Sequence, residues 1–273
     1  MNRKKTSSEL KAMAKEQMLG NYGIAAGTFA ITYGIIFTVV IMVYTAVMMS
    51  IFTTGTMGPA GMASMVSSPW YMPIMFLISA IIGALMSTLL VGYSNIILKI
   101  ARGNKPKVSD LFFCYSNHPD KVIVLYLIVY GVSFLLMLPT QIINYIMMRS
   151  GNDSGAIFLA WAVFYVVGLV LSVIFSMMVS QAYYLYIDYP QESSISFVKQ
   201  SILIMKGNKG RLFYIMLSMI GWYLLIFVSC GIASFWVTPY MAVTIANFYR
   251  DLKGEFDEKP AVDVIIDDNT EIN

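Results

Sequence analysis

Residues 17–98 read QMLGNYGIAAGTFAITYGIIFTVVIMVYTAVMMSIFTTGTMGPAGMASMVSSPWYMPIMFLISAIIGALMSTLLVGYSNIIL, and these 82 residues contain no Asp, Glu, Lys, Arg or His. A soluble domain of this length needs charged groups on the surface that faces water. A membrane helix needs about 20 apolar residues, so this run is long enough for two. Gly, Ser, Thr and Pro are concentrated at 53–73, which is typical of a turn. We therefore predict membrane helices near 24–51 and 73–98.

The composition of the whole chain agrees with a membrane location. Hydrophobic residues make up 58% of the 273 residues and charged residues only 12%, whereas ordinary soluble domains carry about 25% charge. The fold class expected is all-α, a polytopic transmembrane helix bundle. Nucleic-acid binding is not expected, because the basic residues flank the apolar blocks and leave no basic face elsewhere.

Three further blocks contain no charge, at 122–148, 154–187 and 212–249. The first two predict one helix each, near 122–147 and 157–187. The third would extend about 57 Å as one helix, which far exceeds a hydrocarbon core of about 30 Å. Two short helices, near 212–229 and 232–249 with a bend at Ser229-Cys230-Gly231, give six spans in all. One span plus a re-entrant piece is the alternative.

The basic residues predict the orientation. Of the 15 that precede position 250, 14 lie in the N-terminal segment and in the loops 99–121 and 188–211, and the exception is Arg149. Positive loops stay in the cytoplasm, so we expect a multi-pass protein of the cell membrane with both termini inside. The domains predicted are a cytoplasmic N-terminus at 1–22, a six-span membrane domain at 23–249 and an acidic, disordered cytoplasmic tail at 250–273.

A weak internal repeat supports the six spans. A short amphipathic stretch, a polar turn and a membrane helix follow one another three times. The turns lie near 20–23, 116–117 and 206–210, and they recur about every 91 to 96 residues. This period predicts three helical hairpins.

The amphipathic stretches predict contact with the bilayer surface. Thr6 and Glu9 form a capping-box pattern before a helix that carries Leu10, Met13 and Met18 on one face. A second apolar stripe follows at 195–205. We expect both helices to lie on anionic inner-leaflet lipid. Recognition of a partner or of a lipid headgroup is the less favoured alternative.

Polar side chains within the predicted spans are few. Gln141 and Asn144 lie one helical turn apart after Pro139, and Gln181 lies near the inner end of another span. These three form the candidate polar pocket. Structural hydrogen bonding is the favoured explanation for the pair Gln141 and Asn144, and a solute site is the alternative.

Catalysis finds little support in the sequence. His118 is the only histidine, and Cys114 and Cys230 fit neither a metal site nor a disulfide. There is no GxSxG and no P-loop motif. We therefore expect a non-enzymatic protein without cofactor or metal, either a scaffold or an accessory partner of a membrane complex, with a homo-oligomer left open. A small-solute or lipid permease is the alternative, and an intramembrane enzyme is least favoured.

Both ends of the chain resemble a known family. The segment 11–23, KAMAKEQMLGNYG, resembles the opening of a family of bacterial integral membrane proteins, the domain of unknown function 975, and the segment 238–252, TPYMAVTIANFYRDL, resembles its close. The resemblance implies a membrane location and a helix bundle. It implies no activity and no catalytic or binding residue.

Overall fold

The computed structural model describes residues 4–53, 61, 68, 70–150 and 154–257, and every regular element within them is a helix. Most of the predicted turn at 53–73 and residues 258–273 of the predicted tail lie outside the described residues. The elements are α1 Ser7–Met18, α2 Tyr22–Thr53, α4 Tyr71–Ala101, η1 Val108–Phe112, α5 Phe113–Ser116, α6 Pro119–Ser150, α7 Gly155–Val179, α8 Ala182–Asp188, α9 Ser194–Met205, α10 Lys209–Leu217, α11 Ile220–Val228 and α12 Ser234–Leu252.

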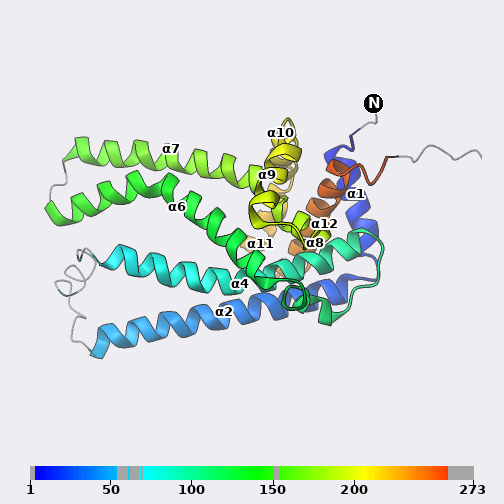
Figure 1. Ribbon diagram of the computed structural model, residues 1–273, viewed down its shortest axis with the longest axis horizontal. Helices are drawn as coiled ribbons and strands as arrows, with labels where there is room; N and C mark the ends of the chain where they lie inside the picture. The colour runs from blue at the N-terminus through cyan, green and yellow to red at the C-terminus, as the bar shows by residue number, and fades with distance from the viewer. Residues whose placement is uncertain (1–3, 54–60, 62–67, 69, 151–153, 258–273) are drawn as a thin grey trace, which may run out of the picture.

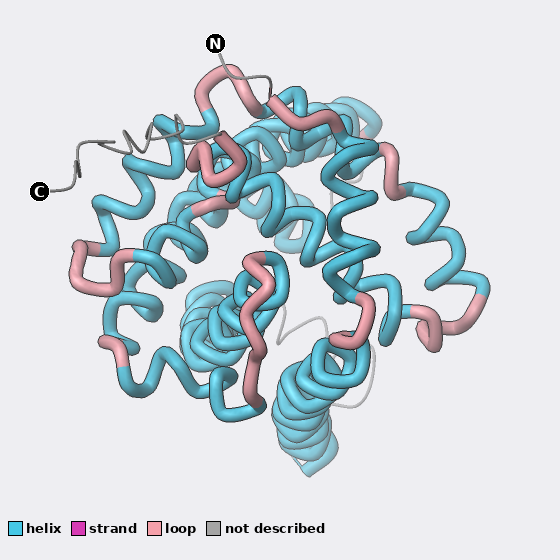
Figure 2. Tube along the Cα trace, turned by 90° about the vertical axis from the view of Figure 1, so that its right-hand side faces the viewer, coloured by secondary structure: helices cyan, strands magenta, loops and turns pink. Residues whose placement is uncertain are grey.

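Four long helices, α2, α4, α6 and α7, extend side by side from one end of the molecule (Figure 1). The remaining helices gather at that end around the bases of the long ones, and we call this assembly the hub (Figure 2). The long helix α6 packs against both α4 and α7, while α2 packs against α4. The first and last described residues both belong to the hub end (Figure 1).

Within the described residues, five helical segments are long and apolar enough to cross a membrane. This confirms an all-helical, membrane-like fold. The predicted sixth span corresponds to α12, which is not among the five. The five segments are Tyr22–Ser50, Pro73–Ala101, Pro119–Met147, Gly155–Asp188 and Lys209–Val228.

The amphipathic helix α1 forms as its sequence predicts. The Thr6 hydroxyl accepts a hydrogen bond from the Glu9 backbone N–H at 3.3 Å, and a Glu9 carboxylate oxygen accepts one from the Thr6 N–H at 2.6 Å. The apolar face of α1, however, is buried against protein: Leu10, Ala14 and Met18 are fully buried and α1 packs on α12. The prediction that this face of α1 lies on lipid is therefore wrong. The face is part of the hub core because α12 packs against it.

The three predicted turns share one geometry. Asn21, Asn117 and Asn208 each donate a backbone N–H to the carbonyl three residues earlier, at 2.9, 3.1 and 3.0 Å. Each also donates its side-chain Nδ2 to the carbonyl four residues earlier, at 2.9, 3.0 and 2.9 Å. The residue before the asparagine has a left-handed backbone in two turns, at Gly20 and Gly207. The three turns of the sequence repeat therefore share a local hydrogen-bond geometry.

The short helices between the repeats pack at close range. Gly92 of α4 faces the backbone of η1, and a Cβ at this position would lie 1.8 Å from the Leu111 carbonyl oxygen. Only glycine permits this approach. The helix η1 is thereby fixed onto α4.

Candidate functional site

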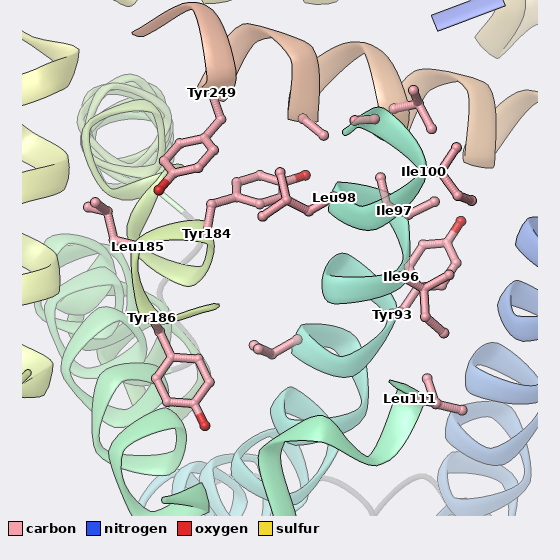
Figure 3. Close-up of a cluster of buried hydrophobic side chains, with 14 of the residues drawn as sticks. Tyr93, Ile96, Ile97, Leu98, Ile100, Leu111, Tyr184, Leu185, Tyr186 and Tyr249 are labelled. Atoms are coloured by element: carbon pink, nitrogen blue, oxygen red, sulfur yellow. The ribbon is translucent and has the colours of Figure 1, made fainter. Parts of the chain in front are cut away.

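The inner ends of α4, α8 and α12 converge in the centre of the hub, where a cluster of large side chains is buried. Figure 3 shows Tyr184, Tyr249 and Leu98 pointing toward one another from these three helices. The Tyr184 and Tyr249 rings stack with centroids 5.1 Å apart. Stacked, buried aromatic rings add stability beyond the area that they bury. The centre of the hub therefore joins one helix end from each repeat.

Asp188, the last residue of α8, is held by side chains from the other two repeats. Arg102 donates to both Asp188 carboxylate oxygens, at 2.7 and 3.0 Å. The Tyr249 hydroxyl donates to one of them at 2.7 Å. A two-bond contact between guanidinium and carboxylate is both strong and directional. Asp188 thus connects the end of the second repeat to those of the first and third.

Glu255 lies beyond the end of α12 and extends the same network. It forms ion pairs with Arg102 and with the Nε of Arg250, the latter at 2.8 Å. Burial raises the pKa of the Glu255 carboxyl, but the hydrogen bonds and charges of Arg102 and Arg250 outweigh it, so the pKa lies below its ordinary value. The carboxylate is therefore ionised at neutral pH and shared by two arginines.

Arg250 also lies at the contact between α1 and α12. Its guanidinium donates to the Ala101 carbonyl oxygen and to the Asn247 side chain, the latter at 3.2 Å. Gln17 donates to the same carbonyl at 2.8 Å and accepts from Asn247 at 2.7 Å. The segments 11–23 and 238–252, in which the family resemblance was found, are thus in direct contact.

A second tie holds the N-terminal residues to α10 and α12. Arg211 donates to the Asp251 carboxylate at 2.6 Å and to the Lys5 carbonyl oxygen at 2.7 Å. The Lys5 backbone N–H donates to the other Asp251 oxygen at 3.1 Å. Lys4 donates to Asn208 in the third turn at 2.9 Å. The chain's first described residues are therefore fixed by hydrogen bonds.

Three carboxylates of the hub, those of Asp188, Asp251 and Glu255, are each paired with a guanidinium group and connect the helices. Among the described residues, no group of three or more His, Cys, Asp and Glu is placed to hold a metal ion. Both cysteines are free, with Cys114 buried and Cys230 exposed. Burial raises the pKa of the Cys114 thiol to about 12, although a hydrogen bond with Tyr186 opposes the shift. A thiol that stays protonated is a poor nucleophile.

The structure does not bring together the three residues predicted to line a polar pocket. Gln141 and Asn144 are half-buried in the outer part of α6, whereas Gln181 is fully buried at the junction of α7 and α8. Close packing of Gly168 on Leu136 sets the register of α6 and α7. At 1.5 Å per residue, Gln181 then lies about 27 Å along α7 from the level of Gln141.

Gln181 itself has a structural setting. Its backbone N–H donates to the Ser201 hydroxyl at 3.2 Å, and its side-chain nitrogen donates to the Ser180 hydroxyl at 2.8 Å. The side-chain oxygen is buried without a partner in the described residues. Gln181 thus links the junction of α7 and α8 to α9.

Hydropathy does not predict the hub network. Arg102, Asp188 and Arg250 lie at or near the ends of charge-free blocks, and this pattern indicates topology without indicating how the charges pair. Arg102 follows α4, Asp188 ends α8 and Arg250 lies within α12, so the three do not occupy equivalent positions in the sequence repeat. No local pattern marks them as partners.

These features define a class: an all-helical, multi-pass type of protein whose long apolar helices are joined by a polar hub at one end. Residues 1–255 match the family model described as "Protein of unknown function (DUF975)". The chain belongs to this family. No curated protein and no solved structure matches it.

Proposed function

We propose that this protein is a non-enzymatic scaffold or accessory subunit of a plasma-membrane complex, with its hub at the cytoplasmic face of the membrane and both termini in the cytoplasm. Support comes from the arrangement of charge and apolar surface. The hub carries both ends of the described chain, and the long apolar helices extend from it in one direction (Figure 1). Basic residues favour the cytoplasmic side.

The observation that carries the scaffold proposal is how little the long helices are covered. Only 6% of the most apolar part of Tyr22–Ser50 is buried within the protein, and the same holds for Gly155–Asp188. Phe37 and Val40 of α2 are exposed, as are Val166 and Val170 of α7. Exposed apolar faces of this length suit lipid or the membrane helices of another protein.

Photo-crosslinking in the native membrane tests this proposal. A photoreactive amino acid at Val40 samples the exposed face of α2, and one at Leu125, which is fully buried, is the matched control. We expect a discrete protein adduct, either with another membrane protein or with a second copy, at Val40 and none at Leu125. If positions around the whole circumference of α2 and α7 give no protein adduct, the scaffold proposal is wrong.

A permease is the second candidate, and one observation favours it. Gln141 and Asn144 are half-buried within an apolar helix, and neither side chain forms a hydrogen bond with another described residue. Pro139 lies just before them in α6, which Figure 1 shows bent. Solute uptake by proteoliposomes that is abolished by Gln141→Leu and Asn144→Leu, without loss of folding, would favour the permease over the scaffold.

The three-hairpin arrangement is also part of this proposal, and the contacts of α10 support a shallow third hairpin in place of two full crossings. The Ser218 hydroxyl, just after α10, lies 3.1 Å from the Ser7 hydroxyl and accepts from Lys11 at 3.1 Å. A helix flanked by charged α1 is suited to the membrane surface. Only α11 and the following turn then remain to enter the bilayer, and nine residues extend about 14 Å. Six full spans would require twice that depth.

A further inference from the structure

An aromatic cavity beside α1 has a lining unlike that of the hub core. It has a volume of about 300 Å³ and lies between α1, the start of α2, α11 and α12. Its lining residues are Lys15, Tyr22, Trp222, Trp236, Val237 and Tyr240. We propose that this cavity binds one anionic phospholipid, with the phosphate at Lys15 and an acyl chain along the aromatic rings.

The polar groups of the lining favour a ligand that supplies oxygen acceptors. The Lys15 ammonium, the two indole N–H groups and the two phenol hydroxyls are all hydrogen-bond donors. Within the described part of the chain, none of these five side chains forms a hydrogen bond with another residue. A phosphodiester and the ester groups beside it offer several acceptors on one molecule.

The charge of the lining favours an anion. Lys15 is exposed at the end of α1 and forms no ion pair with a described residue. Its neighbour on the same helix face, Lys11, is already used in a hydrogen bond to Ser218. No carboxylate lines the cavity, and Glu16, adjacent in sequence, is exposed outside it. An incoming phosphate therefore meets an uncompensated positive charge.

The aromatic rings favour a ligand with an apolar part. Trp222 and Trp236 remain 41% and 57% exposed, and the Trp222 ring packs edge-on to Tyr240 with centroids 5.8 Å apart. Tryptophan and tyrosine are enriched where headgroups meet acyl chains. Phe227 and Val228, the last two residues of the helix that carries Trp222, are exposed as well. A free phosphate or nucleotide would leave this apolar surface unused.

Fluorescence quenching by brominated lipids tests the proposal in the full-length protein. Trp222 and Trp236 become the only reporters in a Trp70→Phe/Trp161→Phe background. The protein is reconstituted into phosphatidylcholine discs that contain increasing fractions of dibrominated phosphatidylglycerol or dibrominated phosphatidylcholine. Incorporation into the discs reports membrane insertion separately, so failure of the lipid site and failure of the membrane proposal are distinguishable.

One uncompensated lysine near a membrane surface is expected to favour the anionic lipid by about fivefold. We expect that preference in the reporter background, and we expect Lys15→Gln to reduce it to near onefold. Lys199→Gln is the matched control, because Lys199 is an exposed lysine on α9, the equivalent helix of the third repeat, and lies outside the cavity. It should retain the preference.

Two results would overturn the proposal. The first is equal quenching by both brominated lipids, which would show that the cavity does not select an anionic headgroup. The second is an equal loss of preference in Lys15→Gln and Lys199→Gln, which would assign the preference to the general charge of the hub. Tyr240→Phe provides a second variant, since it removes one donor and keeps the ring, and it should weaken phosphatidylglycerol binding while preserving quenching by phosphatidylcholine.

Discussion

Asn247 donates a hydrogen bond to the side-chain oxygen of Gln17, 230 positions earlier in the chain, at 2.7 Å. Asn247 is fully buried. The Gln17 side chain in turn donates a hydrogen bond to the Ala101 carbonyl oxygen at 2.8 Å. The last helix of the third repeat is thereby joined to the first and last helices of the first repeat. These hydrogen bonds connect α1, α4 and α12, so the stability of the hub depends on both the N-terminal helix and the last helix.

Asn247→Ala is expected to destabilise the protein by about 1–3 kcal/mol, because it removes a buried hydrogen bond and leaves the Gln17 oxygen without its donor. For a chain of this size, each kcal/mol lowers the melting temperature by about 2–4 °C. Thermal unfolding of the purified protein in detergent measures the change. Asn104→Ala, in an exposed loop, is the control and should leave the melting temperature unchanged. If both variants have the same melting temperature, the hydrogen bond between Asn247 and Gln17 does not stabilise the hub.

Gly92→Ala is expected to be more damaging than its size suggests. The added methyl would lie 1.8 Å from the Leu111 carbonyl oxygen, and backbone atoms cannot move aside as a flexible side chain can. Overpacking of this kind costs about 1–3 kcal/mol. Gly131→Ala on α6 has open space around it and should be neutral or slightly stabilising, since alanine favours a helix. The comparison of these two glycines fails if both variants unfold at the same temperature.

The sequence predicts the long helices of this protein because hydropathy largely determines them. Charge-free blocks of 27 to 82 residues have few alternatives to membrane helices, and the Asn-containing turns precede α2, α6 and α10. Hydropathy does not indicate the breaks between α7 and α8 or between α10 and α11. The capping box at Thr6 and the bend at Ser229-Cys230-Gly231 are likewise local features. In the structure α11 ends at Val228, and Cys230 and Gly231 have left-handed backbones.

The hub could not be predicted in the same way, because its contacts join residues that are far apart in the sequence. Asp188 and Arg102 are 86 positions apart, and Arg102 and Glu255 are 153 apart. The hydropathy pattern of α1 is typical of an interfacial helix, because the pattern contains no information about the packing of α12 on the apolar face of α1. The pocket residues failed to converge for the same reason: Gln141 and Gln181 were grouped by polarity, whereas their helices place them at different depths.

Glu255 makes the stability of the hub depend on pH. Its pKa lies below the ordinary value of about 4.3 in an unfolded chain. Because the pKa of Glu255 is lower in the folded protein than in the unfolded chain, the carboxylate stabilises the folded state. This contribution is fully present above the unfolded pKa and is lost as the pH falls through the folded pKa. We expect the melting temperature to decrease below about pH 4.3.

Glu255→Gln is the variant that tests this assignment. It should be less stable than the natural protein at pH 7, and the difference between the two should shrink as the pH falls, because the natural carboxyl then becomes neutral as well. Asp257→Asn serves as the control for the loss of one acidic group from the same segment. A constant difference at all pH values would show that another group causes the pH dependence.

Cys230 is a natural reporter for the depth of the third hairpin. It lies in the exposed apolar turn between α11 and α12, while Cys114 is fully buried in the hub. If that turn stops inside the bilayer, the Cys230 thiol stays protonated, and neither a membrane-permeant nor a charged maleimide should label it in intact cells or inverted vesicles. Both reagents should label it once the membrane is dissolved in detergent. Cys114 should react with neither reagent until the protein is denatured, because its thiol is inaccessible and its pKa is raised to about 12.

Engineered cysteines calibrate both sides of the membrane in a Cys230→Ser background. Ser154→Cys, at the start of α7, should be labelled by the charged reagent from outside the cell, and Lys105→Cys, in the hub loop, only in inverted vesicles. In the natural protein, Cys230 should differ from both of these positions, because the nine residues of α11 extend only about 14 Å into a core of about 30 Å. Labelling of Cys230 by the charged reagent from outside would instead establish that α11 and α12 cross fully and that the protein has six spans.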